Sequence, residues 1–90
     1  MNSFMVVSTF VPGTDMTEVM AVVAEEQAKV AELKAAGKIG AVYLSTVERG
    51  TVFLEIFAED AATAGATVAS LPMAKWWELD IYPINAPVQR

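Results

Sequence analysis

The chain has 90 residues, 54% of them hydrophobic, and a formal net charge of −5 at pH 7. Its six lysines and arginines are scattered rather than gathered in a basic stripe, which argues against a nucleic-acid partner. The sequence contains no cysteine and no histidine, and this excludes disulfides, thiolate metal sites, thiol nucleophiles and the commonest general base. We therefore expect one cytoplasmic domain (residues 1–90) without a metal, a cofactor, a signal peptide or a membrane span.

The first predicted elements are a strand and a long helix. Residues 4–11 form an unbroken run of apolar and hydroxyl side chains, which is typical of a central strand covered on both faces. Asp15 stands three residues before a glutamate, the spacing of a capping box, so a helix is expected from Met16 to about Ala36, ending at Gly37.

A period of 3.6 residues gives this helix one mostly apolar stripe. The stripe consists of Met16, Val19, Met20, Val23, Gln27 and Val30. Glu26 lies at its edge and could lean over it, so Glu26 is a candidate for a buried acid or base.

The next two strands form a predicted hairpin around which the chain is organised. Residues 39–47 and 51–58, rich in β-branched and aromatic side chains, flank a turn at Glu48-Arg49-Gly50. Because side chains alternate along a strand, one face of the hairpin is aliphatic and suits a layer of helices. The opposite face carries aromatic rings, hydroxyls and a carboxylate, from Tyr43, Ser45, Phe53, Glu55 and Phe57.

Asp60 is expected to cap a second helix over residues 61–70, and a last strand is expected over residues 78–84. The order β-α-β-β-α-β predicts a ferredoxin-like α+β fold, in which a four-stranded antiparallel sheet has two helices on one face. The hydrophobic fraction exceeds what one small core needs, which predicts a second buried surface. We expect a homodimer or higher homo-oligomer that pairs the aromatic faces as a dimeric α/β barrel enclosing a cavity.

Several stretches together resemble the muconolactone isomerase family. They are the opening strand from Phe4, Thr14-Asp15-Met16, Ala24-Glu25-Glu26, the helix exit over residues 31–37, Leu71-Pro72-Met73 with the aromatics behind it, and Asp80-Ile81. The resemblance covers nearly the whole chain. It implies a small cofactor-free protein that assembles through its sheet and shifts a proton on an unsaturated lactone during aromatic-acid breakdown.

A proton shift needs a base near the acidic carbon and hydrogen-bond donors for the enolate oxygen. Glu55 lies between Phe53 and Phe57, and burial of that face would make its carboxylate a useful base near neutral pH. Asp80 and Glu26 are the second candidates for the base. The candidate donors to the oxyanion are Tyr43, Ser45, Ser8 and Tyr82. The alternative interpretation is that Glu55 pairs across a dimer with Arg49 or Lys75 and only holds the interface.

Aromatic side chains make the predicted pocket suitable for a flat, weakly charged ligand. They are Tyr43, Phe53, Phe57, Trp76 and Trp77. Adjacent residues of a strand point in opposite directions, so at most one of the two tryptophans is expected to line the pocket. Two other classes of function stay open: a cofactor-independent monooxygenase acting on an aromatic, polyketide-like substrate, and a non-catalytic small-molecule binder.

Overall fold

The computed structural model describes residues 1–45 and 49–85. Its elements are β1 (Asn2–Phe10), α1 (Met16–Ala21), α2 (Val23–Ala35), β2 (Ile39–Leu44), β3 (Thr51–Ala58), α3 (Ala61–Ala69), the 3-10 helix η1 (Pro72–Trp76) and β4 (Trp77–Ile84). The strands lie in the order β2-β3-β1-β4, and every neighbouring pair is antiparallel. The predicted ferredoxin-like α+β fold is confirmed, with β1 central as expected. Of the predicted hairpin, residues 46–48 lie outside the described residues.

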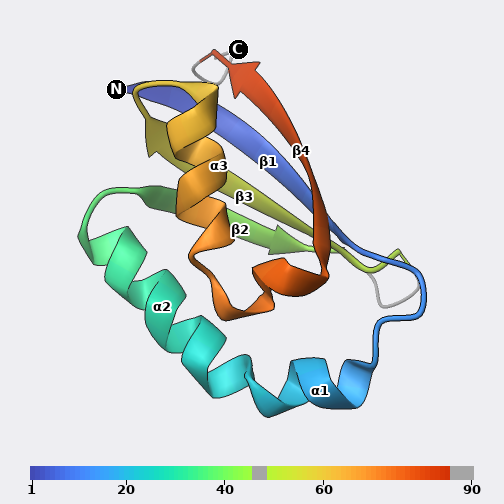
Figure 1. Cartoon of the computed structure of the whole chain (residues 1–90). Coiled ribbons are helices and arrows are strands. Elements are labelled where there is room, and N and C mark those ends of the chain that lie inside the picture. Colours follow the sequence, from blue (N-terminus) through green and yellow to red (C-terminus); the bar gives the residue numbers. More distant parts are fainter. Residues whose placement is uncertain (46–48, 86–90) are drawn as a thin grey trace.

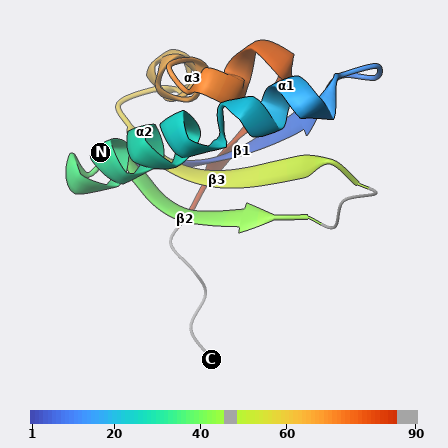
Figure 2. The ribbon, with the colours of Figure 1, turned by 90° about the horizontal axis from the view of Figure 1, so that it is seen from below.

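The helices cover one face of the sheet. Figure 2 shows α1, α2 and α3 together on the same side of the strands, while no helix of the described chain covers the other side. We call that second side the open face. In Figure 1, α3 crosses the sheet and α1 and α2 follow an arc along its flank. Within this layer α3 packs against β1, β3 and β4, whereas α2 packs against β2 and η1.

The core lies between the sheet and α3. Alternate residues of β1 and β3 point into it, as the period of two predicts. Its buried members are Phe4, Val6, Leu54, Ile56, Ala58, Ala64, Val68 and Leu71, joined by Leu33, Ile39 and Trp77. Burying one valine, leucine or isoleucine side chain contributes about 1.5–3 kcal/mol, so this cluster is the main source of stability.

The expectation of one uninterrupted helix over residues 16–36 is wrong in one respect. The chain leaves helical geometry at Val22, with φ −107° and ψ 9°, and divides into α1 and α2. Two consecutive β-branched residues, Val22 and Val23, have a weak helical preference, which makes this the natural point for a break. Both ends agree with expectation, because Asp15 accepts the Thr17 N–H at 2.9 Å and Gly37 adopts a φ of 76° just after α2.

At this break the chain changes direction, so that α1 and α2 together follow an arc beside the sheet (Figure 1). Across residues 1–45 and 49–85, no helix is long and apolar enough to cross a membrane.

Candidate functional site

A hollow lies on each face of the sheet. The first, which we call the helix-side cavity, is bounded by the α1–α2 arc and the sheet and has a volume of about 690 Å³. The second is a smaller hollow of about 350 Å³ on the open face. Ligand sites in proteins commonly have volumes of about 300–1,000 Å³, so size alone permits a ligand in either place.

The helix-side cavity is mostly apolar. One wall is the stripe predicted from the helical period, consisting of Met16, Val19, Met20, Val23, Gln27 and Val30. The sheet supplies the facing wall through Phe10, Val42, Leu44, Val52 and Leu54, and Met73 and Trp77 also line it. Met16 and Met20 are 50% and 65% exposed, so α1 roofs the cavity without packing tightly onto the strands.

Glu26 is the only acidic side chain among the described residues that line this cavity. Its Oε1 accepts the backbone N–H of Met73 at 2.9 Å, a contact that ties α2 to η1 across 47 residues of sequence. Burial raises the pKa of the Glu26 carboxyl above its ordinary value, and the Met73 N–H offsets part of that rise. The result is a carboxyl that keeps its proton to higher pH and is a stronger base once ionised, a combination typical of acid–base catalysts.

The other polar groups of the cavity come from the same helix. Gln27 and Lys34 line it from α2, and Lys34 is the only cation among the described lining residues. Glu26 therefore stands in a largely apolar enclosure, which is the physical cause of its perturbed pKa.

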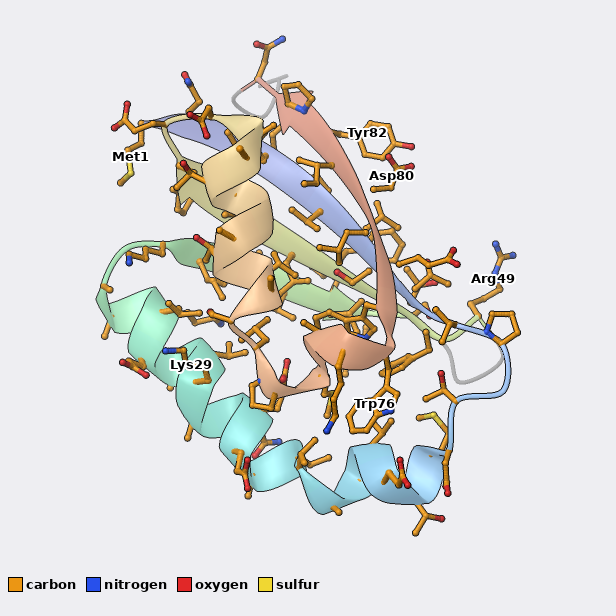
Figure 3. The ribbon with its side chains drawn as sticks, viewed as in Figure 1. Met1, Lys29, Arg49, Trp76, Asp80 and Tyr82 are labelled. Carbon is orange, nitrogen blue, oxygen red and sulfur yellow. The ribbon has the colours of Figure 1, made fainter. Side chains whose placement is uncertain are left out.

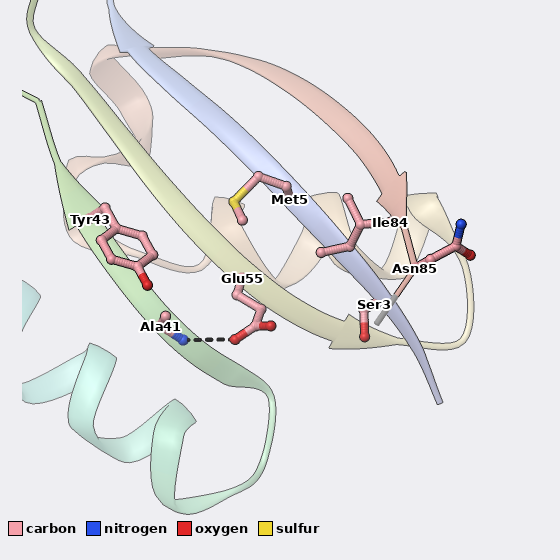
Figure 4. Close-up of a pocket in the computed structure, with 7 residues that line it drawn as sticks. All are labelled: Ser3, Met5, Ala41, Tyr43, Glu55, Ile84 and Asn85. Atoms are coloured by element: carbon pink, nitrogen blue, oxygen red, sulfur yellow. Dashed lines mark hydrogen bonds between the residues drawn. The ribbon is translucent and has the colours of Figure 1, made fainter. Parts of the chain in front are cut away.

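The hollow on the open face is built around Glu55 (Figure 4). Its Oε1 accepts the backbone N–H of Ala41 at 3.0 Å. The pairing of β2 with β3 changes register between Ile39 and Val42, which leaves backbone groups there outside the regular ladder. A Cβ added at Gly40 would overlap Glu55 Oε1, so glycine is what allows the carboxylate to approach the β2 backbone. This geometry gives Glu55 a structural task in holding the irregular part of β2.

Most other predicted site residues lie on the open face. Register places Tyr43 opposite Phe53, Phe57 opposite Ser3, and Asp80 and Tyr82 opposite Val7 and Met5. Asp80 and Tyr82 project together from β4 (Figure 3), and the Tyr82 hydroxyl donates to Asp80 Oδ2 at 2.8 Å. This hydrogen bond, reinforced by the Asp80 charge, raises the pKa of Tyr82. Ser45 stands at the end of β2, where its Oγ accepts the Thr51 N–H at 2.9 Å.

Ser8 does not join the other predicted donors. It is fully buried on the face that the helices cover, so the sheet separates it from Tyr43 and Tyr82. The reason is the alternation of β1, in which Phe4, Val6 and Ser8 share one side.

The two tryptophans have different surroundings. Trp76 ends η1, and the Lys75 ammonium lies 4.5 Å from its ring centroid. Trp77 begins β4, is buried, packs edge-to-face on Phe10 and lines the helix-side cavity. The predicted residues Glu26 and Trp77 are thus brought to one cavity, on the opposite side of the sheet from Glu55, Tyr43 and Asp80. The sequence did not predict the role of Met73 in this cavity, because Met73 contributes a backbone N–H to Glu26 and such a group has no signal in the sequence.

The family model described as muconolactone delta-isomerase matches residues 3–88. Among solved structures, the 5-chloro-2-hydroxyhydroquinone dehydrochlorinase of Burkholderia phenoliruptrix AC1100, in complex with 2,5-dihydroxybenzoquinone, is similar with a TM-score of 0.69. The two sequences are 20% identical, and the match covers 94% of this chain and 95% of that one, so the likeness shows a common fold. No curated protein matches this chain.

Proposed function

The chain belongs to the muconolactone delta-isomerase family, and from that premise we propose that it is a cofactor-free isomerase that shifts a proton on a small unsaturated lactone or enone in the helix-side cavity. The observation that carries the proposal is the Glu26 carboxyl, whose pKa is raised by burial in a largely apolar enclosure of ligand size. The two other candidate bases lie on the open face, where Glu55 accepts the Ala41 N–H and Asp80 accepts the Tyr82 hydroxyl.

The chemistry requires one group that takes and returns a proton. Ionised Glu26 would remove a proton from the carbon next to the ligand's carbonyl, and the C–H electron pair would move into a dienolate. The protonated carboxyl would then deliver the proton to the far carbon of the original double bond, which leaves the new double bond next to the carbonyl, so that atoms and charge balance over the cycle. The Met73 N–H holds Oε1, which leaves the second carboxylate oxygen for the proton.

The lining of the cavity supports a compact, weakly charged ring as the substrate. Apolar side chains supply most of both walls, and Gln27 and Lys34 are the polar groups besides Glu26. A ligand bound against these apolar walls would displace water from them, which would strengthen the base and protect a dienolate from stray protonation.

The test follows the α-angelica lactone double-bond shift in D₂O by proton NMR, recording product formation and solvent deuterium uptake together. Glu26→Gln, which keeps an acceptor for the Met73 N–H, is expected to lower the rate about 10²-fold or more. Glu25→Gln is the matched control, since the exposed neighbour Glu25 does not line the cavity. Full activity in Glu26→Gln would contradict the proposal.

The remaining outcomes point to the other functions. Oxygen uptake with a naphthol or an anthrone, in place of isomerisation, would indicate the monooxygenase. Saturable binding without turnover of any lactone or enone would indicate a binder.

We further propose that the open face is covered by a second copy of the chain. Met5, Val7, Phe53 and Phe57 are only partly buried there, beneath no helix of the described chain. Aromatic and aliphatic side chains of this kind are typical of subunit interfaces, and a sheet that meets its own copy satisfies the apolar excess of the composition. Sedimentation should show a dimer that Val7→Glu converts into a folded monomer, whereas Thr17→Glu on the exposed side of α1 should leave it dimeric. A monomeric wild type would refute this part.

A further inference from the structure

Two buried polar atoms on the helix-covered face of the sheet lack a partner. Ser8 Oγ and Trp77 Nε1 make no hydrogen bond within residues 1–45 and 49–85. Ser8 is 0% exposed and Trp77 8% exposed. A buried donor without an acceptor costs the folded state its full desolvation penalty, and native structures tolerate few such groups without a reason.

Strand register places Ser8 and Trp77 on the sheet face that borders the helix-side cavity, which Trp77 lines and Ser8 does not. In the pairing of β1 with β4, Phe10 lies opposite Trp77 and Ser8 lies opposite Leu79. Ser8 and Trp77 are therefore diagonal neighbours on one face, a relation in which Cβ atoms lie within about 7–8 Å. Trp77, Phe10 and the Ser8 cross-strand partner Val52 all line the cavity.

We propose that Trp77 Nε1–H, with Ser8 Oγ–H as a second donor, is the binding site for the carbonyl oxygen of the cavity's ligand. An indole N–H can only donate and a serine hydroxyl can donate, so together they suit an acceptor such as a lactone or enone oxygen. The edge-to-face contact with Phe10, at 5.9 Å between ring centroids, positions the indole.

The site would also serve the proposed reaction, on which this role in catalysis rests. When Glu26 removes a proton from the neighbouring carbon, negative charge develops on the carbonyl oxygen. Donors fixed in a water-excluded wall stabilise that charge more than they stabilise the neutral carbonyl. Trp77 and Ser8 on the sheet would therefore bind the carbonyl oxygen, while Glu26 on α2 would transfer the proton.

The test uses the indole N–H signals of the full-length protein, which contains two tryptophans. Trp76→Phe assigns the Trp77 signal in a ¹⁵N–¹H spectrum. The probes are α-tetralone, which has a carbonyl, and tetralin, which has nearly the same shape without one. Saturating α-tetralone should move the Trp77 indole proton downfield, and tetralin should not. Equal shifts with both probes, or a shift confined to Trp76, would overturn the proposal.

Variants give the second measurement. Trp77→Phe keeps a ring against Phe10 and removes the N–H, so it should weaken α-tetralone binding about three- to tenfold and leave tetralin binding nearly unchanged. Ser8→Ala should weaken α-tetralone binding by a smaller factor, again without effect on tetralin. An equal loss for both probes would indicate altered packing and would refute the carbonyl site.

The two proposals fail in different ways. A downfield Trp77 shift in a protein that isomerises no lactone leaves the carbonyl site standing and refutes the isomerase. Isomerisation that depends on Glu26, with a Trp77 signal that α-tetralone does not move, refutes the carbonyl site alone.

Discussion

Substitutions of Glu55 test whether its carboxylate has a structural or a catalytic role. Its hydrogen bond with the Ala41 N–H, at 3.0 Å, closes the irregular part of β2. Hydrogen bonds to a charged group contribute about 1.5–3 kcal/mol, and for this partly exposed side chain the lower end applies. Glu55→Ala should therefore lower the free energy of unfolding by about 1.5 kcal/mol, or lower Tm by about 6–12 °C for a domain of this size. Glu55→Gln keeps an acceptor and should cost less than about 1 kcal/mol.

Gly40 tests the same contact from the other strand. A Cβ at position 40 overlaps Glu55 Oε1 and lies 3.0 Å from Phe57 Cε2, so Gly40→Ala must displace the carboxylate from Ala41. In the Glu55→Ala background the main obstacle is gone, and Gly40→Ala should cost about 1 kcal/mol less than in the wild type. Urea unfolding followed by circular dichroism at one fixed protein concentration measures the cycle.

Two results would refute the structural assignment of Glu55. One is an equal cost of Gly40→Ala in both backgrounds. The other is loss of isomerisation in Glu55→Gln with unchanged stability, which would make Glu55 the catalytic base and move the site to the open face.

Three further outcomes concern stability. Because burial raises the pKa of Glu26 above its ordinary 4.5, the unfolded chain loses this proton first as pH rises, and the free energy of unfolding falls between 4.5 and the raised value. Glu26→Gln should gain stability relative to the wild type across that window in urea titrations, whereas a difference independent of pH would contradict the assignment. Hydrogen bonds from Thr63 lower the pKa of Asp60, so its cap is effective above the ordinary 3.8 and is lost as pH falls through the lowered value. Asp60→Ala should thus lower Tm at neutral pH, and Asp60→Asn should lower it less. If Asp60→Ala lowered Tm by the same amount in strong acid, the assignment of Asp60 as a charged cap would be contradicted. Ile56→Val at a fully buried position should cost about 0.5–1.5 kcal/mol. The same loss of a methylene in Leu44→Val, at a 76% exposed side chain, should cost less than about 0.5 kcal/mol, and equal costs would argue against the core position of Ile56.

Local patterns in the sequence were sufficient to predict the architecture of the fold. Alternation in β1 and β3, the caps at Asp15 and Asp60 and the glycine at position 37 are consequences of backbone geometry over a few residues. The order of strands and helices then follows, since few topologies bury one aliphatic sheet face under two helical segments. The helical period likewise identified the apolar stripe of α1 and α2, although not that this stripe lines a cavity.

The location of the site depended on contacts between distant parts of the chain. Glu26 and Glu55 are both carboxylates beside apolar residues in the sequence, and nothing local separates them. The two carboxylates have different surroundings in the folded chain. Glu26 accepts the Met73 N–H from η1 in a hollow under the α1–α2 arc, whereas Glu55 accepts the Ala41 N–H on the open face. The desolvation that raises the pKa of Glu26 is set by everything packed around that carboxyl, so only the assembled tertiary structure decides it.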